Sequence, residues 1–574
     1  MTKRIRITAL LIAAAFILGL CSGCKNVRQD TAATPAQTAE VTATEAPEET
    51  PERMKNGGAL SFLPEEPIPV PKLSEMVYDR PDTGKLIAEY EALTEKAASC
   101  GDAQELLNDY YQVAIDAHDF GSMYELAYFR FAMDTEDVYF SDEYDYCDEQ
   151  SAVITEKMNA LFAAFAASPL RDELERAYFG EGFFEDYDDF NDADEAYFDL
   201  MQQENDLRFR YYSLLEDAYF NTNAQLEQNH DTFGGIFIEL VKVRGQIAAA
   251  KGYDNYMDYC YASTYKRDYT TIQTWEYLDL VKEKLAPLMQ DPKIADDYAE
   301  YSYWKEAKSL EYLSAAAEKM GGPILDAFRF MKDRELYDIS YNSSKLNTGY
   351  TDYINNYEAP IIFIDPSGRD LLITLFHEFG HYTDFYCSYG FSGSYEIAET
   401  YSQAMQYLAF AYADPFTDSE RAENLRATLS DLLVYAILRQ AAFAEFELRA
   451  YSLEPEELTP ERLDAIYGQC IEDYGLSELG SIWTNSMFWI AYGHFFNVPG
   501  YVISYSVSAV ASLQICRMEA EEPGSGVAAF IRLLGRTHGK KFVAVIEEAE
   551  LDSPFDAEAM EKAAAFLNEA FGRN

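Results

Sequence analysis

A short segment past the middle of the chain combines two histidines and a glutamate at helical spacing. The residues are His377, Glu378 and His381, in the motif HEFGH. Side chains four residues apart lie one turn apart on the same face of an α-helix, so both imidazoles can bind one ion. Glu378 is turned away from that line by one residue, which suits a general base beside the ion. The spacing therefore predicts a catalytic metal site on a helix.

The alternative is a pair of surface histidines on a solvated helix. The residues around the motif argue against it, because they are apolar on most faces of the helix: Leu371, Leu372, Leu375, Phe376 and Phe379. Such a helix is expected to be buried, and buried polar groups need partners. A shared metal ion supplies that partner.

A catalytic zinc site normally has three protein ligands. No third histidine lies closely downstream of the motif, but the next helical stretch carries Glu396 and Glu399. These two carboxylates are three residues apart and share one face of a helix, so spacing alone leaves both open as the third ligand.

The motif and the segment after it resemble one family of metallopeptidases. HEFGH, a short loop and a Glu-x-x-Ser segment are similar to oligoendopeptidase F and thimet oligopeptidase. The resemblance implies that the third ligand is Glu399, three residues before Ser402, with Glu396 as the fallback. It also implies one Zn²⁺ per chain and hydrolysis of peptide bonds in oligopeptides. The similarity continues, in order, over most of residues 240–574 and includes Arg439-Gln440.

A second polar group occurs in the run HFFNVPGYVISY, which contains His494, Tyr501 and Tyr505. The family has a His and two Tyr four residues apart in this region. The resemblance implies that His494 and Tyr501 stabilise the negative charge that develops on the carbonyl oxygen, with Tyr505 as a further catalytic candidate. The alternative is packing in an aromatic core, since the chain has 45 Tyr.

The chain departs from the family pattern at two positions near the motifs. Asp384 stands where the family usually has a His, and Gln406 where it usually has a Glu. Both are expected next to the ligands, where they bear on catalytic rate and peptide preference. The remaining histidines, His118, His230 and His538, lie in acidic or basic polar stretches and are expected to be solvated and not catalytic.

The elements that must position these residues are expected to be mostly helices. Apolar residues at helical spacing, such as Leu86, Tyr90 and Leu93, favour helices from about residue 74 to 319. The resemblance implies an all-α class, with a small β-sheet beside the active site and a two-lobed helical shell around a deep substrate channel. The β-favouring run 359–364 is expected to bind the substrate by strand addition.

The first residues of the chain resemble a bacterial lipoprotein signal. Three cations precede an apolar stretch that ends shortly before Cys24. We expect a signal peptide at 1–24 with Cys24 as the lipid-anchored residue, a disordered Ala/Thr/Pro/Glu-rich tether at 25–58, an N-terminal helical region at 59–235 and a catalytic region at 236–574. The expected location is outside the cytoplasm, on the bacterial cell membrane. An ordinary secretory signal is the alternative.

Composition restricts the possible partners. The formal net charge of −54 disfavours nucleic-acid binding, which needs a positive surface. It could attract cationic peptides, or only keep the protein soluble. Two other functions remain open: a helical metallocarboxypeptidase or dipeptidyl carboxypeptidase, and a lipoprotein that binds peptides without cutting them. Glu378 argues against the second, because a binding protein has no need of a base there.

Overall fold

The protein is described by a computed structural model. It describes residues 70–570 except 181, 185–186, 188–194, 216–217, 290–305, 368–370, 389, 391–393, 413–432 and 535–539. The predicted signal peptide, Cys24, the tether and His538 lie outside the described residues. Within the described part, no helix has the length and apolar character that crossing a bilayer requires.

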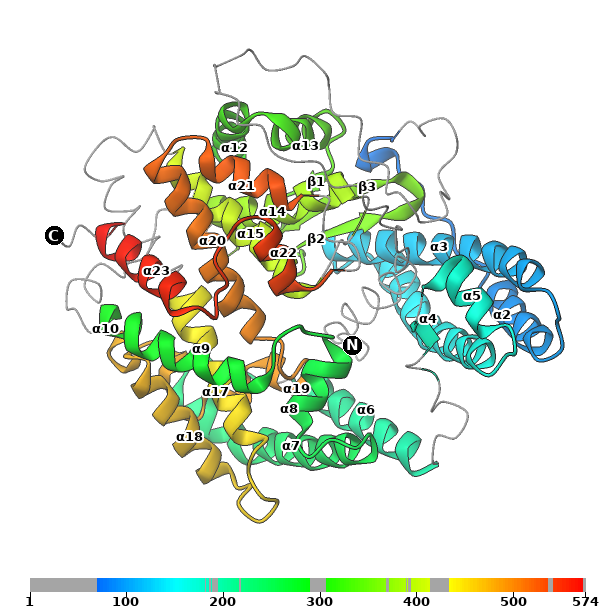
Figure 1. Cartoon of the computed structure of the whole chain (residues 1–574), viewed down its shortest axis with the longest axis horizontal. Helices are drawn as coiled ribbons and strands as arrows, with labels where there is room; N and C mark the ends of the chain where they lie inside the picture. The colour runs from blue at the N-terminus through cyan, green and yellow to red at the C-terminus, as the bar shows by residue number, and fades with distance from the viewer. Residues whose placement is uncertain are drawn as a thin grey trace, which may run out of the picture.

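Helices make up most of the described chain, which confirms the predicted fold class (Figure 1). The longer helices are α2 (Thr83–Ala97), α3 (Ala103–Met133), α4 (Val138–Ala166), α6 (Glu195–Leu215), α7 (Asn223–Ala250), α9 (Thr271–Lys284), α12 (Glu306–Met320), α13 (Gly322–Asp333), α14 (Leu371–Ser388), α15 (Tyr395–Ala411), α17 (Gln440–Ala450), α18 (Pro460–Asp473), α20 (Ile503–Glu521) and α23 (Ala557–Ala570). The shorter ones are α5 (Arg171–Leu174), α8 (Tyr256–Tyr259), α10 (Ala286–Met289), α19 (Gly493–Asn497), α21 (Ser525–Leu533) and α22 (Phe542–Glu548).

The first helices of the described chain pack around a core of their own. Asp102 and Asp137 accept backbone N–H groups at the starts of α3 and α4, which satisfies donors that a helix start leaves free. Aromatic side chains of α3, α4 and the turn after α5, such as Tyr110, Phe162 and Phe179, fill the space between these helices. In Figure 1, α2 to α5 form a group at one side of the molecule.

A second and larger core extends from α6 to α23 and also includes Leu73, Met76 and three residues of α3, which are Leu126, Phe129 and Ala132. Apart from these residues, the change from one core to the other comes between α5 and α6. The domain boundary expected between residues 235 and 236 instead falls inside α7, which is one continuous helix. The packing therefore divides the chain earlier than the sequence pattern does.

The single sheet of the described residues has three strands, β1 (Tyr337–Asp338), β2 (Gly349–Ile354) and β3 (Ala359–Ile364). β3 lies in the middle, parallel to β1 and antiparallel to β2. All six residues of β3 are buried, as a continuous apolar run in a central strand requires. The prediction that 359–364 binds substrate by strand addition does not fit this topology, because β2 pairs with all six residues of β3 and β1 pairs with Ile362 and Phe363 on the other side.

Helix α14 lies against the sheet on one side and against α15 on the other. The crossing of α14 and α15 is very close at Gly380. A Cβ atom on Gly380 would lie 2.4 Å from the carbonyl oxygen of Tyr401. Only a glycine allows this approach, so the fourth residue of HEFGH sets the distance between the two helices.

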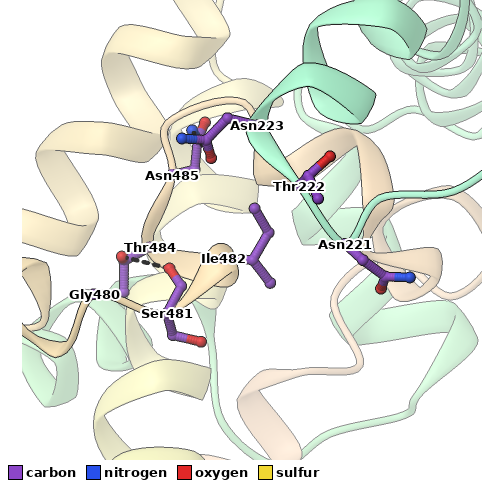
Figure 2. Close-up of a pocket in the computed structure, with 8 residues that line it drawn as sticks. All are labelled: Asn221, Thr222, Asn223, Gly480, Ser481, Ile482, Thr484 and Asn485. Atoms are coloured by element: carbon purple, nitrogen blue, oxygen red, sulfur yellow. Dashed lines mark hydrogen bonds between the residues drawn. The ribbon is translucent and has the colours of Figure 1, made fainter.

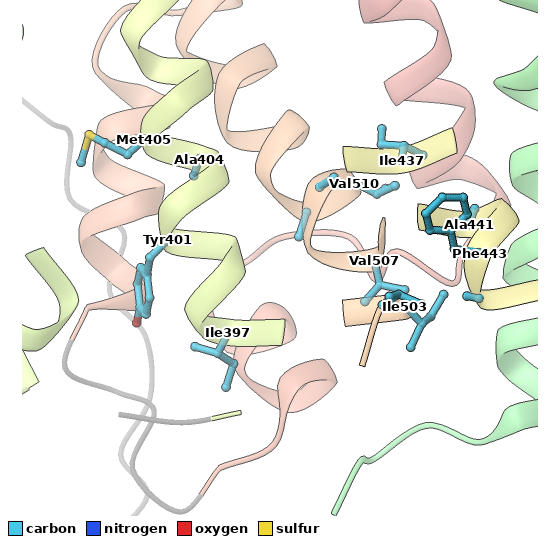
Figure 3. Packing of buried hydrophobic residues seen from close by; sticks show 14 of the residues in the cluster. Ile397, Tyr401, Ala404, Met405, Ile437, Ala441, Phe443, Ile503, Val507 and Val510 are labelled. Carbon is cyan, nitrogen blue, oxygen red and sulfur yellow. The ribbon is translucent and has the colours of Figure 1, made fainter. Parts of the chain in front are cut away.

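Helix α20 packs on the far side of α15 and continues the core toward residues 434–450. In Figure 3, Ile503, Val507 and Val510 of α20 face Ile437, Ala441 and Phe443. The segment Val434–Arg439 is a π-helical turn that leads into α17. These buried contacts fix α15 and α20 side by side at the centre of the molecule.

Candidate metal centre

Three of the predicted residues meet where α14 crosses α15. One donor atom each from His377, His381 and Glu399 lies within 4.8 Å of the others. The Nε2 atoms of His377 and His381 are 3.6 and 4.0 Å from Oε2 of Glu399. The carboxylate is buried, and the two imidazoles keep part of their surface open.

The donor set and its spacing fit a zinc ion. Two ligand atoms at zinc bond lengths and a tetrahedral angle are about 3.3–3.6 Å apart. The distances to Glu399 are slightly longer than this, so small side-chain movements would complete the site. Burial, with the charge of His377 as a second cause, lowers the pKa of His381 well below its ordinary value, and a neutral imidazole is the form that binds a metal.

The structure separates the two glutamates that spacing left open. Glu396 is bound to Arg267, with 2.6 Å between Oε1 and Nε, and also accepts hydrogen bonds from Tyr269 and Ser504. Burial alone would raise the pKa of Glu396, but Arg267 and Tyr269 lower it. Glu396 therefore belongs to a buried ion pair, and Glu399 is the carboxylate beside the histidines.

Hydrogen bonds hold two of the candidate ligands in place. Nδ1 of His377 is 3.2 Å from the amide oxygen of Gln406, which leaves Nε2 directed to the site. Ser402 donates to Oε2 of Glu399 at 2.9 Å. Burial raises the pKa of Glu399. The charge of His377 and the hydrogen bonds from Ser402 and Tyr501 offset part of this rise. Gln406 thus takes the ligand-orienting position in which the family resemblance led us to expect a Glu.

Glu378 is buried between α14 and the sheet, with 5% of its surface exposed. Thr351 of β2 donates to its Oε2 at 2.8 Å and lies 2.9 Å from its backbone oxygen. Sequence reasoning did not identify Thr351, because its strand meets Glu378 only through tertiary packing. The contact ties the predicted base to the edge strand of the described sheet.

The three predicted donors form an aromatic group next to Glu399. The rings of His494 and Tyr501 are 5.8 Å apart, those of His494 and Tyr505 6.0 Å, and those of the two tyrosines 5.1 Å. Tyr501 donates to Oε1 of Glu399 at 3.2 Å. Burial, and after it the charge of Arg439, lowers the pKa of His494 to about 4, so His494 is a neutral donor at neutral pH.

Two buried polar side chains, Arg244 and Glu447, hold the loop that carries this group, and no sequence pattern indicated their role. Arg244 of α7 donates to the backbone oxygens of Phe495 and Phe496, at 3.3 and 2.5 Å. Glu447 of α17 accepts the N–H of Gly500 at 3.0 Å. Both side chains are fully buried, with 0% exposure. Together they fix the backbone on either side of the turn that leads to Tyr501.

The other predicted polar residues lie elsewhere. Asp384 is buried in α14 and accepts a hydrogen bond from Ser388. The expectation that His118 and His230 are solvated is wrong, because both are half-buried. Nε2 of His230 is 2.9 Å from Asp464, which joins α7 to α18.

A hollow of ≈ 460 Å³ lies away from these residues, between the start of α7 and the segment 480–485 (Figure 2). Its polar lining is neutral, and consists of amides and hydroxyls such as Asn221, Thr222 and Asn485. Thr484 donates to the backbone oxygen of Ser481 within it. None of the predicted site residues lines this hollow.

Comparison with known proteins gives a consistent result. Residues 73–189 match the family model "Peptidase M3 N-terminal domain", and residues 324–565 match "Peptidase family M3". The two models describe parts of one family and together span more than half of the chain. No curated protein matches the chain.

Solved structures with the same fold include PZ peptidase A bound to an inhibitor, at a TM-score of 0.73 and 21% identity, covering 88% of this chain and 99% of that one. A Bacillus anthracis protein provisionally named oligoendopeptidase F has a TM-score of 0.69 at 22% identity, covering 88% and 98%. Oligoendopeptidase-F from Enterococcus faecium has a TM-score of 0.53 at 15% identity, covering 86% and 98%. At these identities the likeness concerns the fold.

Proposed function

This chain belongs to peptidase family M3, and from that premise we propose that it hydrolyses peptide bonds in oligopeptides as a zinc-dependent endopeptidase. The observation that carries the proposal is the meeting of His377, His381 and Glu399 at the crossing of α14 and α15. These residues would hold one zinc ion. A metallopeptidase with this donor set has the ligand number and types of catalytic zinc sites.

When bound, the zinc ion would acidify a water molecule and polarise the carbonyl of the scissile peptide bond. Glu378 would take the proton of the water and pass it to the leaving amine. Its burial and its hydrogen bond with Thr351 hold the carboxylate on the side of α14 that faces β2. The base is thus part of a rigid element before substrate arrives.

His494 and Tyr501 would donate hydrogen bonds to the carbonyl oxygen as it becomes negative. Tyr501 donates to Glu399 in this structure, so its hydroxyl would exchange that partner for the substrate. Burial raises the pKa of Tyr501 and of Tyr505, which keeps both hydroxyls protonated. Tyr505 lies against Tyr501 and His494 and would position them or add a third donor.

An extended peptide would bind along β2 and not along β3. β2 is the edge strand of the described sheet on the side of Thr351, which contacts Glu378. Hydrogen bonding to an edge strand involves the backbone of the peptide and not its side chains, so peptides of many sequences can bind in this way. This arrangement supports action on oligopeptides of varied sequence, inside the two-lobed helical shell with a deep channel that we propose for this chain.

Replacing the base tests the proposal directly. We expect Glu378→Gln to bind zinc as the wild type does and to lose about 10²–10⁴-fold in kcat, since a general base contributes about that much. The measurement is turnover of a mixed peptide pool, with metal content from elemental analysis and products from mass spectrometry.

The products of the wild type separate the rival functions. If it removes only C-terminal residues or dipeptides, it is a carboxypeptidase or dipeptidyl carboxypeptidase. If it binds peptides and releases no products, it is a peptide-binding lipoprotein. Wild-type protein that is equally active with and without zinc would exclude the mechanism.

We also propose that the protein is exported and anchored to the cell membrane through Cys24, with secretion as the alternative. The support is the sequence at residues 1–24 alone. Cys24→Ser is expected to abolish labelling by a fatty-acid analogue and to release the protein from the membrane fraction. Wild-type protein that is unlabelled and recovered in the medium would support the secreted alternative.

A further inference from the structure

Arg439 has no carboxylate partner among the residues that the structure describes, although the protein is very acidic. The chain has 99 Asp and Glu against 45 Lys and Arg. The buried arginines Arg244 and Arg267 each pair with a glutamate, at 2.8 and 2.6 Å. Among the described residues, no ion pair or hydrogen bond is found for the guanidinium of Arg439, and its Nε is buried without a partner.

Four aromatic rings surround this guanidinium. Its central carbon lies 4.7 Å from the ring centre of Tyr435, 5.0 Å from those of Phe443 and Trp483, and 5.8 Å from that of Tyr492. We call these four rings the cage of Arg439. Phe443 and Trp483 are its buried members. Tyr435, Tyr492 and Arg439 itself keep part of their surface open. Stacked rings fix the plane of a guanidinium and leave its outer N–H groups free to bind an anion.

The cage adjoins the proposed catalytic donors. Tyr492, one of its walls, stacks on His494 with 4.8 Å between ring centres and 13° between planes. Gln440, the residue after Arg439, accepts a hydrogen bond from the hydroxyl of Tyr492 at 3.3 Å. The charge of Arg439 is also near enough to lower the pKa of His494. A peptide in contact with His494 therefore has a fixed positive group within reach of its neighbouring residues.

We propose that Arg439, in its cage of Tyr435, Phe443, Trp483 and Tyr492, is a subsite that binds a carboxylate of the peptide substrate. The inference rests on the proposed peptidase function and deepens it. A planar guanidinium binds a carboxylate through two N–H groups, and such charge-assisted hydrogen bonds are strong in a partly dry site. The carboxylate is either the C-terminus of the peptide or an Asp or Glu side chain near the cleavage site.

The experiment compares matched peptides on the wild type and on Arg439→Gln. One pair of peptides differs in a free or amidated C-terminus, the other in Asp or Asn beside the cleaved bond. We expect the wild type to favour one acidic peptide by about 10- to 100-fold in kcat/KM, mainly through KM, and Arg439→Gln to lose that preference, so that the ratio of kcat/KM for the acidic and the neutral peptide falls toward one. The pair that responds identifies the source of the carboxylate. Arg439→Lys should restore part of the preference.

Arg334→Gln is the matched control. Arg334 is also half-buried, lies 4.6 Å from the ring of Phe330 and has a buried Nε without a partner, but it comes just after α13, in a different part of the fold. It should leave the acid preference unchanged. Equal loss of kcat/KM on acidic and neutral peptides in Arg439→Gln, or a wild type without preference in either pair, would overturn the proposal.

Binding separates this inference from the proposed function. Fluorescence polarisation with the same peptides on Glu378→Gln and on Glu378→Gln/Arg439→Gln needs no turnover. Arg439-dependent binding of the acidic peptide, together with a wild type that hydrolyses none of the peptides, would retain the subsite and reject the peptidase. Turnover by the wild type without any preference for the acidic peptides would retain the peptidase function and reject the subsite.

Discussion

At the scale of single residues, Glu447 shows how a buried carboxyl group supports the site without touching it. It accepts the N–H of Gly500, and its second oxygen is buried without a hydrogen bond. Burial raises the pKa of Glu447 from 4.5 to about 8, although Gly500, Arg244 and Arg267 oppose the shift. At neutral pH the folded protein therefore holds a proton on Glu447 that the unfolded chain releases.

The raised pKa of Glu447 predicts a pH-dependent loss of stability. The folded state binds one more proton than the unfolded state between pH 4.5 and about 8, so the free energy of unfolding falls across this window as pH rises. The slope from one such group is about 1.4 kcal/mol per pH unit at most. Glu447→Gln keeps the acceptor for Gly500 and removes the titration.

The measurement is the free energy of unfolding of both proteins from pH 5 to 9. The difference, variant minus wild type, should increase with pH over the window, while all other titrating groups cancel. A difference that is independent of pH would show that Glu447 is already charged in the folded protein.

At the scale of elements, the site depends on how closely α14 and α15 cross. We predict that Gly380→Ala destabilises the protein by about 1–3 kcal/mol, because the added methyl group would overlap the backbone at Tyr401 and Ser402. Zinc affinity should fall as well, since the shift separates His377 and His381 from Glu399.

Gly245→Ala in α7 is the control, because a Cβ at Gly245 meets nothing within 4 Å. It is expected to be neutral or to stabilise by up to about 1 kcal/mol. Thermal unfolding and zinc titration of both variants check the prediction. If Gly380→Ala matched Gly245→Ala in both measurements, the crossing would tolerate a side chain.

The sequence predicted the local parts of the site and missed those that depend on packing. His377, Glu378 and His381 could be assigned because one turn of helix relates them. The choice between Glu396 and Glu399 was possible only by resemblance, since both occupy one face of α15 and only the tertiary partner Arg267 distinguishes them. The central position of β3 was missed for the same reason: an apolar run does not show which of its neighbours pair with it.

At the scale of the whole molecule, the net charge of −54 should affect which peptides reach the site. We predict that KM for a Lys-rich peptide rises several-fold between about 20 and 200 mM salt, because long-range attraction is screened over this range. The same peptide with Lys replaced by Gln is the control and should show little change. Equal salt dependence of both peptides would leave the charge with a role in solubility only.

The N-terminal packing group, α2 to α5, also contacts the sheet beside the site. α2 to α5 have their own core, yet α3 reaches the sheet through Tyr128 and Phe129, which contact Tyr350 of β2. Phe129 also contacts Phe363 of β3, so the N-terminal group packs on both strands next to Thr351, the partner of Glu378.

The origin of the three ligands on two separate helices has a consequence for how the protein matures. Until α14 docks on α15 at Gly380, the three ligands are not together. The two imidazoles alone, or the carboxylate alone, would bind an ion weakly. On the export route proposed above, a chain threaded through the membrane in extended form would arrive without its ion. It would then have to capture zinc outside the cell, as the last step of becoming active.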